Sequence, residues 1–387
     1  MPVEGTFLLH STGGRGYAHT TFSCRGKAIM GRRLPDWRWL SRLSNEELSR
    51  YDIAVVNLAC AVGLPGTERM DPDLCLARLD YFADRVRHYT ELAMPRFRTN
   101  PEKYENSEAY FRVLCLVTVL QRHMGVRYNP DKKAEDAPFY AEDSFIFGVL
   151  QGPGGTCATL PVVYIAVGRR LGYPLKLVTA KAGPKMDHSF ARWEGEDGER
   201  FNVEGSGDGM HCPPDGSYRT GRYQLSPKDE KLSGHLKSMT PRMELAGFLV
   251  ERACEWRDRK QLRECVDALA WSASLVPEDR VRANTLDHRI NDWTAELKAL
   301  MPPAFPKLYV RYTHRRYPAT LPEDVEYDIH ALGASDNILK DPELNRVWWD
   351  RMRRGERRAG DPVAVHAVSH PGGCDITFEL VRGAAVN

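Results

Sequence analysis

The chain has 387 residues, of which 42% are hydrophobic and 27% charged, and its formal net charge is +2. This length is too great for one small core and predicts roughly two or three domains, while the composition excludes a disordered chain. The small net charge does not favour nucleic acid or an anionic membrane as a partner.

No targeting segment or membrane span is predicted. The opening residues MPVEGTFLLHSTGG lack the basic and then apolar pattern of a signal peptide, and no segment reaches roughly 18 consecutive apolar residues. The nine cysteines include no CxxC pair, which argues against a zinc knuckle or a thioredoxin-type site. Most of them are interpreted as small buried hydrophobic residues in a reducing compartment, so a cytoplasmic location is expected.

The first half of the chain has helical patterning. Residues 1–43 suggest no role, and Ser44-Asn45-Glu46-Glu47 indicates a helix start that leads into 48–64. A second apolar stripe at helical spacing lies within 68–93, and a third helix is predicted at 107–125. We therefore expect a helical platform that ends in a loop at 126–144.

A glycine-rich turn then precedes a helix that begins near a cysteine. Residues 152–155 read GPGG, and Thr156 and Cys157 follow. The apolar face of the predicted helix comprises Leu160, Val163, Val167 and Leu171. Pro161 is tolerated in a first helical turn, and Gly172 is a typical residue just after a helix end. Cys157 is thus predicted to lie at the start of a helix that packs on the core.

Three predicted strands follow this helix. The segments 174–180, 189–195 and 200–206 alternate between apolar and polar residues, and EDG between the last two indicates a hairpin. Helices and a small sheet along one chain predict an α+β fold.

The remaining chain divides into a helical region and a mixed one. Helices are predicted at 243–256, 261–275 and 280–300, and MPPAFP at 301–306 indicates a boundary. Strands are predicted at 307–312, 361–368 and 374–381, with a helix at 343–355. The expected organisation is an N-terminal segment at 1–43, a core with its preceding helices at 44–239, a helical region at 240–302 and a small C-terminal α/β region at 303–387.

Two other clusters of polar residues were weighed as sites. The run RMRRGERR at 351–358 is interpreted as a solvated helix end rather than a phosphate-binding patch. His211-Cys212, beside Asp208 and Asp215, matches no standard metal-site spacing and is interpreted as a loop. Neither a cofactor nor a metal is therefore predicted.

Cys157 is the candidate nucleophile. A thiol attacks as the thiolate, and the free N–H groups of a helix start stabilise that negative charge. The nearest downstream base is His188, at the start of the second strand. Asn202 and Glu204 alternate onto one face of the third strand, so either could orient the imidazole across the hairpin.

These residues resemble the motifs of the transglutaminase-like superfamily. The helix GTCATLPVVYIAVGRRLGYP matches a cysteine that leads a helix ending in R-x-x-G-h-P. HSFARW matches the histidine motif, and FNVE matches the acid motif, with Glu204 where aspartate is commoner. The helices on either side resemble the SirB-type subgroup, whose C-terminal part is tetratricopeptide-like, and the resemblance spans roughly 45–300. It implies a Cys157–His188–Glu204 triad on a papain-like core.

Gln151 is a further candidate. It lies six residues before Cys157, and QGPGGTC is similar to the QG-x-x-G-x-C segment of papain-like proteases. This resemblance implies that the Gln151 amide and the Cys157 backbone N–H form an oxyanion hole.

The expected function is thiol-dependent acyl chemistry on an amide, in a cysteine peptidase or amidase or in a transglutaminase, with a protein or peptide as substrate. A non-catalytic peptide-binding scaffold on the same fold is the alternative. The intact triad favours the enzyme.

Overall fold

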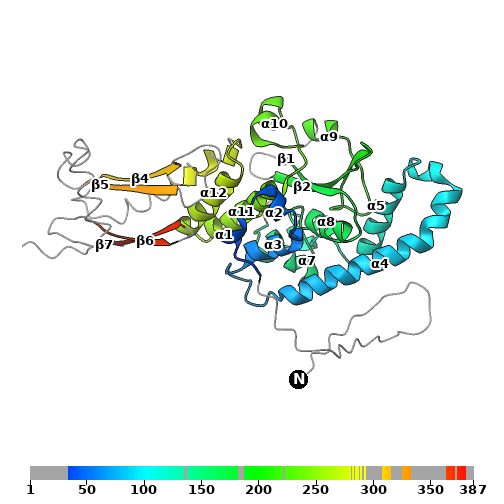
Figure 1. The fold of residues 1–387 in the computed structure, drawn as a ribbon, viewed down its shortest axis with the longest axis horizontal. Coiled ribbons are helices and arrows are strands. Elements are labelled where there is room, and N and C mark those ends of the chain that lie inside the picture. Colours follow the sequence, from blue (N-terminus) through cyan, green and yellow to red (C-terminus); the bar gives the residue numbers. More distant parts are fainter. Residues whose placement is uncertain are drawn as a thin grey trace, which may run out of the picture.

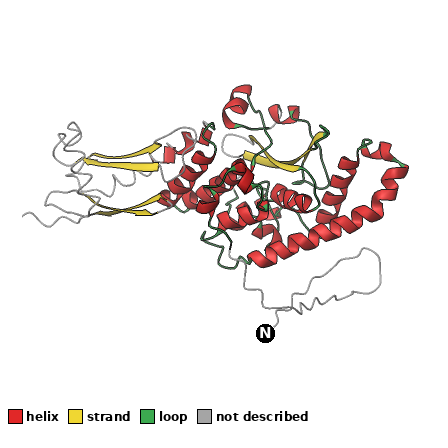
Figure 2. Cartoon of the chain, viewed as in Figure 1, coloured by secondary structure: helices red, strands yellow, loops and turns green. Residues whose placement is uncertain are grey.

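The protein is a mixed helical chain with a three-stranded antiparallel sheet, an α+β arrangement (Figure 2). The structure is a computed structural model. It describes 34–134, 137–181, 187–220, 223–279, parts of 281–292, and the strands 307–314, 325–332, 363–370 and 373–380. Residues 1–33 of the predicted N-terminal segment 1–43 and the predicted helix 343–355 lie outside these residues.

A platform of helices precedes the glycine-rich turn, as predicted. Ser44 and Glu47 form a reciprocal capping box at the start of α2, but the carboxylate of Asp52 then caps a separate helix, α3. The platform consists of α1 (Trp37–Leu40), α2 (Asn45–Leu48), α3 (Ile53–Ala61), α4 (Pro72–Thr99), α5 (Glu108–Thr118), α6 (Ala141–Ser144) and α7 (Phe147–Gln151), with short helical turns at Pro101–Tyr104, Val119–His123 and Pro130–Lys132.

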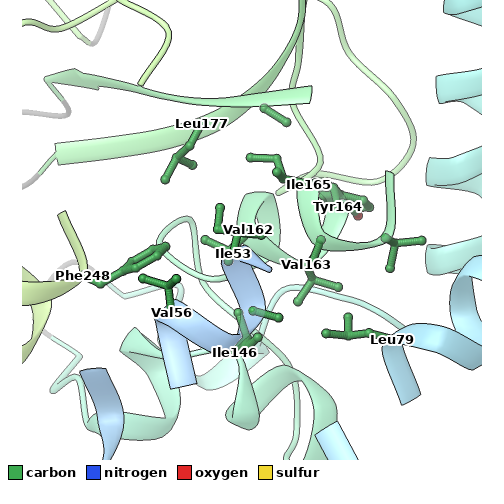
Figure 3. Close-up of a cluster of buried hydrophobic side chains, with 14 of the residues drawn as sticks. Ile53, Val56, Leu79, Ile146, Val162, Val163, Tyr164, Ile165, Leu177 and Phe248 are labelled. Atoms are coloured by element: carbon green, nitrogen blue, oxygen red, sulfur yellow. The ribbon is translucent and has the colours of Figure 1, made fainter. Parts of the chain in front are cut away.

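Helix α8 (Leu160–Arg170) is the centre of the core, and every residue from Leu160 to Gly168 is buried. Figure 3 shows Val162, Val163 and Ile165 of α8 among side chains from the surrounding elements, including Ile53 of α3. The helix ends as predicted, with Gly172 at a φ of +77° that glycine adopts at little cost. A helix packed on all sides gives the turn before it a rigid support.

The sheet lies beside α8 in the order β1 (Leu175–Lys181), β2 (Asp187–Glu194), β3 (Arg200–Val203). Strand β2 begins two residues earlier than predicted and so includes His188, which pairs with Ala180 of β1. One face of the sheet packs on α8, and the other carries α9 (Gly216–Arg219) and α10 (Pro227–Ser233) (Figure 1).

After the sheet, α11 (Pro241–Asp258) and α12 (Leu262–Leu275) pack against each other as a helical pair, as predicted. Further along, β4 (Lys307–His314) pairs with β5 (Val325–Leu332), and β6 (Val363–His370) pairs with β7 (Gly373–Leu380), both antiparallel. Strand β5 was not predicted. In the part of the chain that the structure describes, no helix has the length and apolarity needed to cross a membrane.

Candidate active site

Cys157 lies in the helical turn that leads into α8. The carbonyl of Thr156 accepts a hydrogen bond from the N–H of Leu160 at 3.0 Å, so helical bonding begins one residue before the cysteine. The backbone N–H of Thr156 donates to Oγ1 of Thr159 at 2.8 Å, and its own Oγ1 donates to the carbonyl of Asp143 at 2.7 Å. Cys157 itself is half-buried and follows a residue that is fixed on both sides.

The glycine-rich turn is held against 127–129 rather than being a free hinge. The N–H of Gly155 donates to Arg127 at 3.0 Å, and its carbonyl accepts from Asn129 at 2.7 Å. At Gly154 the φ is +148°, and an added Cβ would lie 2.8 Å from the Arg127 carbonyl oxygen. Among the hydrogen bonds of the described residues, none uses the N–H of Cys157, so this donor is available to a ligand.

His188 links the cysteine to a carboxylate. Its Nε2 donates to Oε1 of Glu204 at 2.6 Å, and the ring is 5% exposed. Burial disfavours the charged ring, but hydrogen bonds and negative charge from Cys157 and Glu204 outweigh that effect and raise the pKa of His188 to about 9. At neutral pH the ring is therefore an imidazolium held between a thiol and a carboxylate.

Glu204 is positioned by the loop that follows β3. It forms an antiparallel bridge with His211, and the next residue, Gly205, accepts hydrogen bonds from Gln121 and from the hydroxyl of Tyr164 at 3.2 Å each. An added Cβ at Gly205 would lie 2.1 Å from the Tyr164 ring, so only glycine fits there. Because Tyr164 belongs to α8, one helix supports both Cys157 and the loop of Glu204.

Tyr218 of α9 is a site residue that the sequence reasoning missed. Its hydroxyl donates to Oε1 of Glu204 at 2.7 Å. Burial and the nearby carboxylate raise the pKa of Tyr218, so the hydroxyl keeps its proton and remains a donor. The Tyr218 ring also stacks on Phe190 at 4.4 Å and 5° and lies near His188 and Tyr223. No local pattern marks a tyrosine in so short a helix as a partner of a strand-end glutamate.

Removing the Tyr218 hydroxyl is expected to weaken the site without unfolding it. We expect Tyr218→Phe to slow iodoacetamide alkylation of Cys157 at pH 6 by about tenfold, because a hydrogen bond to a charged carboxylate is lost. The ring stacking remains in this variant. In a Glu204→Gln background the same change should have little further effect, and an undiminished effect there would contradict a role through Glu204.

Two of the sequence-predicted candidates have other partners. The side-chain amide of Asn202 bonds with Arg192, Asp215 and Pro213, so Glu204 rather than Asn202 contacts His188. Gln151 was predicted to lie over Cys157. Its Oε1 accepts from the N–H of Asp71 at 3.0 Å and from the thiol of Cys75 at 3.2 Å, and the oxyanion-hole role of its amide nitrogen stays a prediction. Gln151 therefore connects the end of α7 to the start of α4, because its amide oxygen accepts both hydrogen bonds.

The other cysteines whose side chains are described differ from Cys157 in their surroundings. Burial raises the pKa of each of them, including Cys115, and the pKa reaches about 12 for Cys60, Cys75 and Cys254 and about 11 for Cys212 and Cys265. A raised pKa keeps these groups as unreactive thiols at neutral pH.

Comparison of the chain with known protein families, curated proteins and solved structures finds no match.

Proposed function

We propose that this protein is a thiol-dependent acyl-transfer enzyme that acts on amide bonds, most simply as a cysteine peptidase or amidase. The observation that carries the proposal is the series Cys157–His188–Glu204. The imidazole is bonded to the largely buried carboxylate of Glu204 at 2.6 Å, and its interaction with Cys157 contributes to its raised pKa. A nucleophile, an oriented base and a free backbone donor are the groups that acyl transfer requires.

The proposed reaction begins with the imidazolium of His188 stabilising the Cys157 thiolate. The sulfur bonds to the substrate carbonyl carbon, and the oxyanion accepts a hydrogen bond from the Cys157 N–H. His188 then donates its proton to the leaving nitrogen as the C–N bond breaks, which leaves a thioester. The now neutral imidazole takes a proton from water as the water attacks, and the acid product leaves with the thiolate restored. An amine in place of water would give transamidation by the same steps.

A transglutaminase-like core is the proposed fold behind this chemistry. Its support is the chain order: a cysteine in the first turn of a buried helix, a histidine at the start of the second of three antiparallel strands, and an acid just past the third. The helical pair after the sheet is compatible with a SirB-type arrangement.

Selective alkylation tests the proposal. At pH 6, iodoacetamide is expected to label Cys157 at least about 100-fold faster than Cys212 or Cys254, because only the thiolate reacts. The comparison is matched, since all three side chains are half-buried, whereas the pKa values of the other two are raised to about 11 and about 12. Peptide mapping by mass spectrometry measures each rate. Equal rates at the three cysteines would contradict the proposed enzyme.

A further inference from the structure

A small cavity lies beside the turn that carries Cys157, between the sheet and the helices α11 and α12. Ala158, the residue after Cys157, lines it, and so does Ser189, whose side chain points to the face of β2 opposite His188. Its volume is about 140 Å³, and its other walls include Phe248 of α11 and Leu269 of α12. An apolar cavity of about 150 Å³ admits a benzene-sized molecule, so this space fits one side chain rather than a folded ligand.

The cavity wall carries an acid whose charge is not neutralised by a described neighbour. Glu251 of α11 lines the cavity and is half-buried, and within the described part of the chain no hydrogen bond or ion pair reaches its carboxylate. The arginine in the same wall, Arg282, is already bound to Asp279 at 2.9 Å and to Ser272 at 3.0 Å. A cation that entered the cavity would therefore meet a free carboxylate.

The charges around Glu251 also favour the binding of a cation. Burial, followed by the negative charges of Asp187 and Glu255, raises the pKa of Glu251 to about 7, and this outweighs the opposite effect of Arg257 and Arg282. A carboxylate that is costly to ionise alone gains more than an exposed one from an incoming positive charge.

We propose that this cavity binds the basic side chain of a peptide substrate, lysine or arginine, with its apolar stem against Phe248 and Leu269 and its cationic end at Glu251. The inference rests on the proposed function, since it places the specificity pocket one residue from Cys157, at Ala158. Glu251 is then a specificity-determining residue that takes no part in the bond-making steps.

Two irreversible reagents that differ only in charge test the pocket. Acetyl-lysyl chloromethyl ketone and acetyl-norleucyl chloromethyl ketone share an apolar stem, and each alkylates a reactive thiolate with loss of chloride. At pH 8, where Glu251 is ionised, the lysyl reagent is expected to modify Cys157 about tenfold faster than the norleucyl reagent, as for a hydrogen bond between charged groups. The ratio should fall toward one in Glu251→Gln. Urea denaturation of Glu251→Gln checks separately that this variant is folded.

The control is Asp258→Asn, which removes the same charge from an exposed position of α11 outside the cavity. This variant should keep the wild-type ratio. The wild-type ratio should also fall between pH 8 and pH 6 as Glu251 is protonated. Because both reagents need the same thiolate, the ionisation of Cys157 cancels in the ratio.

If both reagents modify Cys157 rapidly at equal rates, the specificity inference fails and the enzyme proposal stands. If neither modifies Cys157 faster than an ordinary thiol, the proposed function itself fails. A lysyl preference that persists in Glu251→Gln overturns the role of Glu251.

Discussion

Replacing His188 with alanine is expected to slow the reaction of Cys157 with iodoacetamide at pH 6 by about two orders of magnitude. An isolated thiol has a pKa of about 8.5 and is less than about 1% ionised at that pH. In the wild-type protein His188 interacts with Cys157, and the carboxylate of Glu204 stabilises the positive charge of His188, a residue that is 5% exposed. Without this partner, the remaining stabilisation of the thiolate comes from the helix start alone.

The pH dependence separates this role from simple packing. Because the pKa of His188 is raised to about 9, the ring is charged throughout pH 6 to 8, and the slowing caused by His188→Ala should be present over that whole interval. The slowing should shrink as the pH rises through about 9, because the wild-type ring then loses the positive charge that the alanine variant lacks at every pH. His235→Ala is the matched control, since this histidine is also buried but contacts Thr179 and Asp187. Equal slowing in the two variants would mean that His188 acts only through the fold.

Local signals explain which parts of this site could be predicted. The order of glycine-rich turn, cysteine and apolar stripe predicted a helix that leads away from Cys157. This prediction was possible because helical spacing depends only on residues a few positions apart in the chain. Alternation predicted the strands that carry His188 and Glu204. The choice between Asn202 and Glu204 required the hairpin register, which pairs Asn202 with Arg192. That register places Asn202 too far along β2 from His188, and no signal within the strand itself sets it.

Contacts between distant segments are what the sequence did not predict. Gln151 is close to Cys157 in sequence, but α4 offers the Asp71 N–H as a partner 80 residues away. Tyr218 contacts Glu204 because α9 packs on the sheet face opposite α8. No periodic pattern in the sequence indicates this packing or this contact. The break between α2 and α3 did have a local cause, because Asp52 is a strong N-cap residue inside the expected helix.

The support behind Tyr218 is an ion pair in the interior. Arg192 of β2 has no exposed side-chain surface, and its guanidinium donates to Asp215 at 2.6 Å, to Asn202 at 2.7 Å and to the carbonyl of Leu236 at 2.8 Å. Asp215 precedes α9, the helix that carries Tyr218. Burial lowers the pKa of Arg192, which shows that its charge is costly here and depends on Asp215. The pair therefore joins the second strand to the helix that holds the donor of Glu204.

Asp215→Ala is accordingly expected to lower the free energy of unfolding by about 3–5 kcal/mol, because it leaves the Arg192 charge buried without its carboxylate. Urea denaturation measures the loss. Asp208→Ala is the matched control: its pair with Arg122 at 3.0 Å is exposed at 63% and 80%, and breaking it should cost at most about 1 kcal/mol. Adding Arg192→Met to Asp215→Ala should recover part of the stability, since the stranded charge is then gone. If the double variant is less stable than Asp215→Ala alone, the loss does not come from an unpaired charge, and the guanidinium acts instead through its bonds to Asn202 and Leu236.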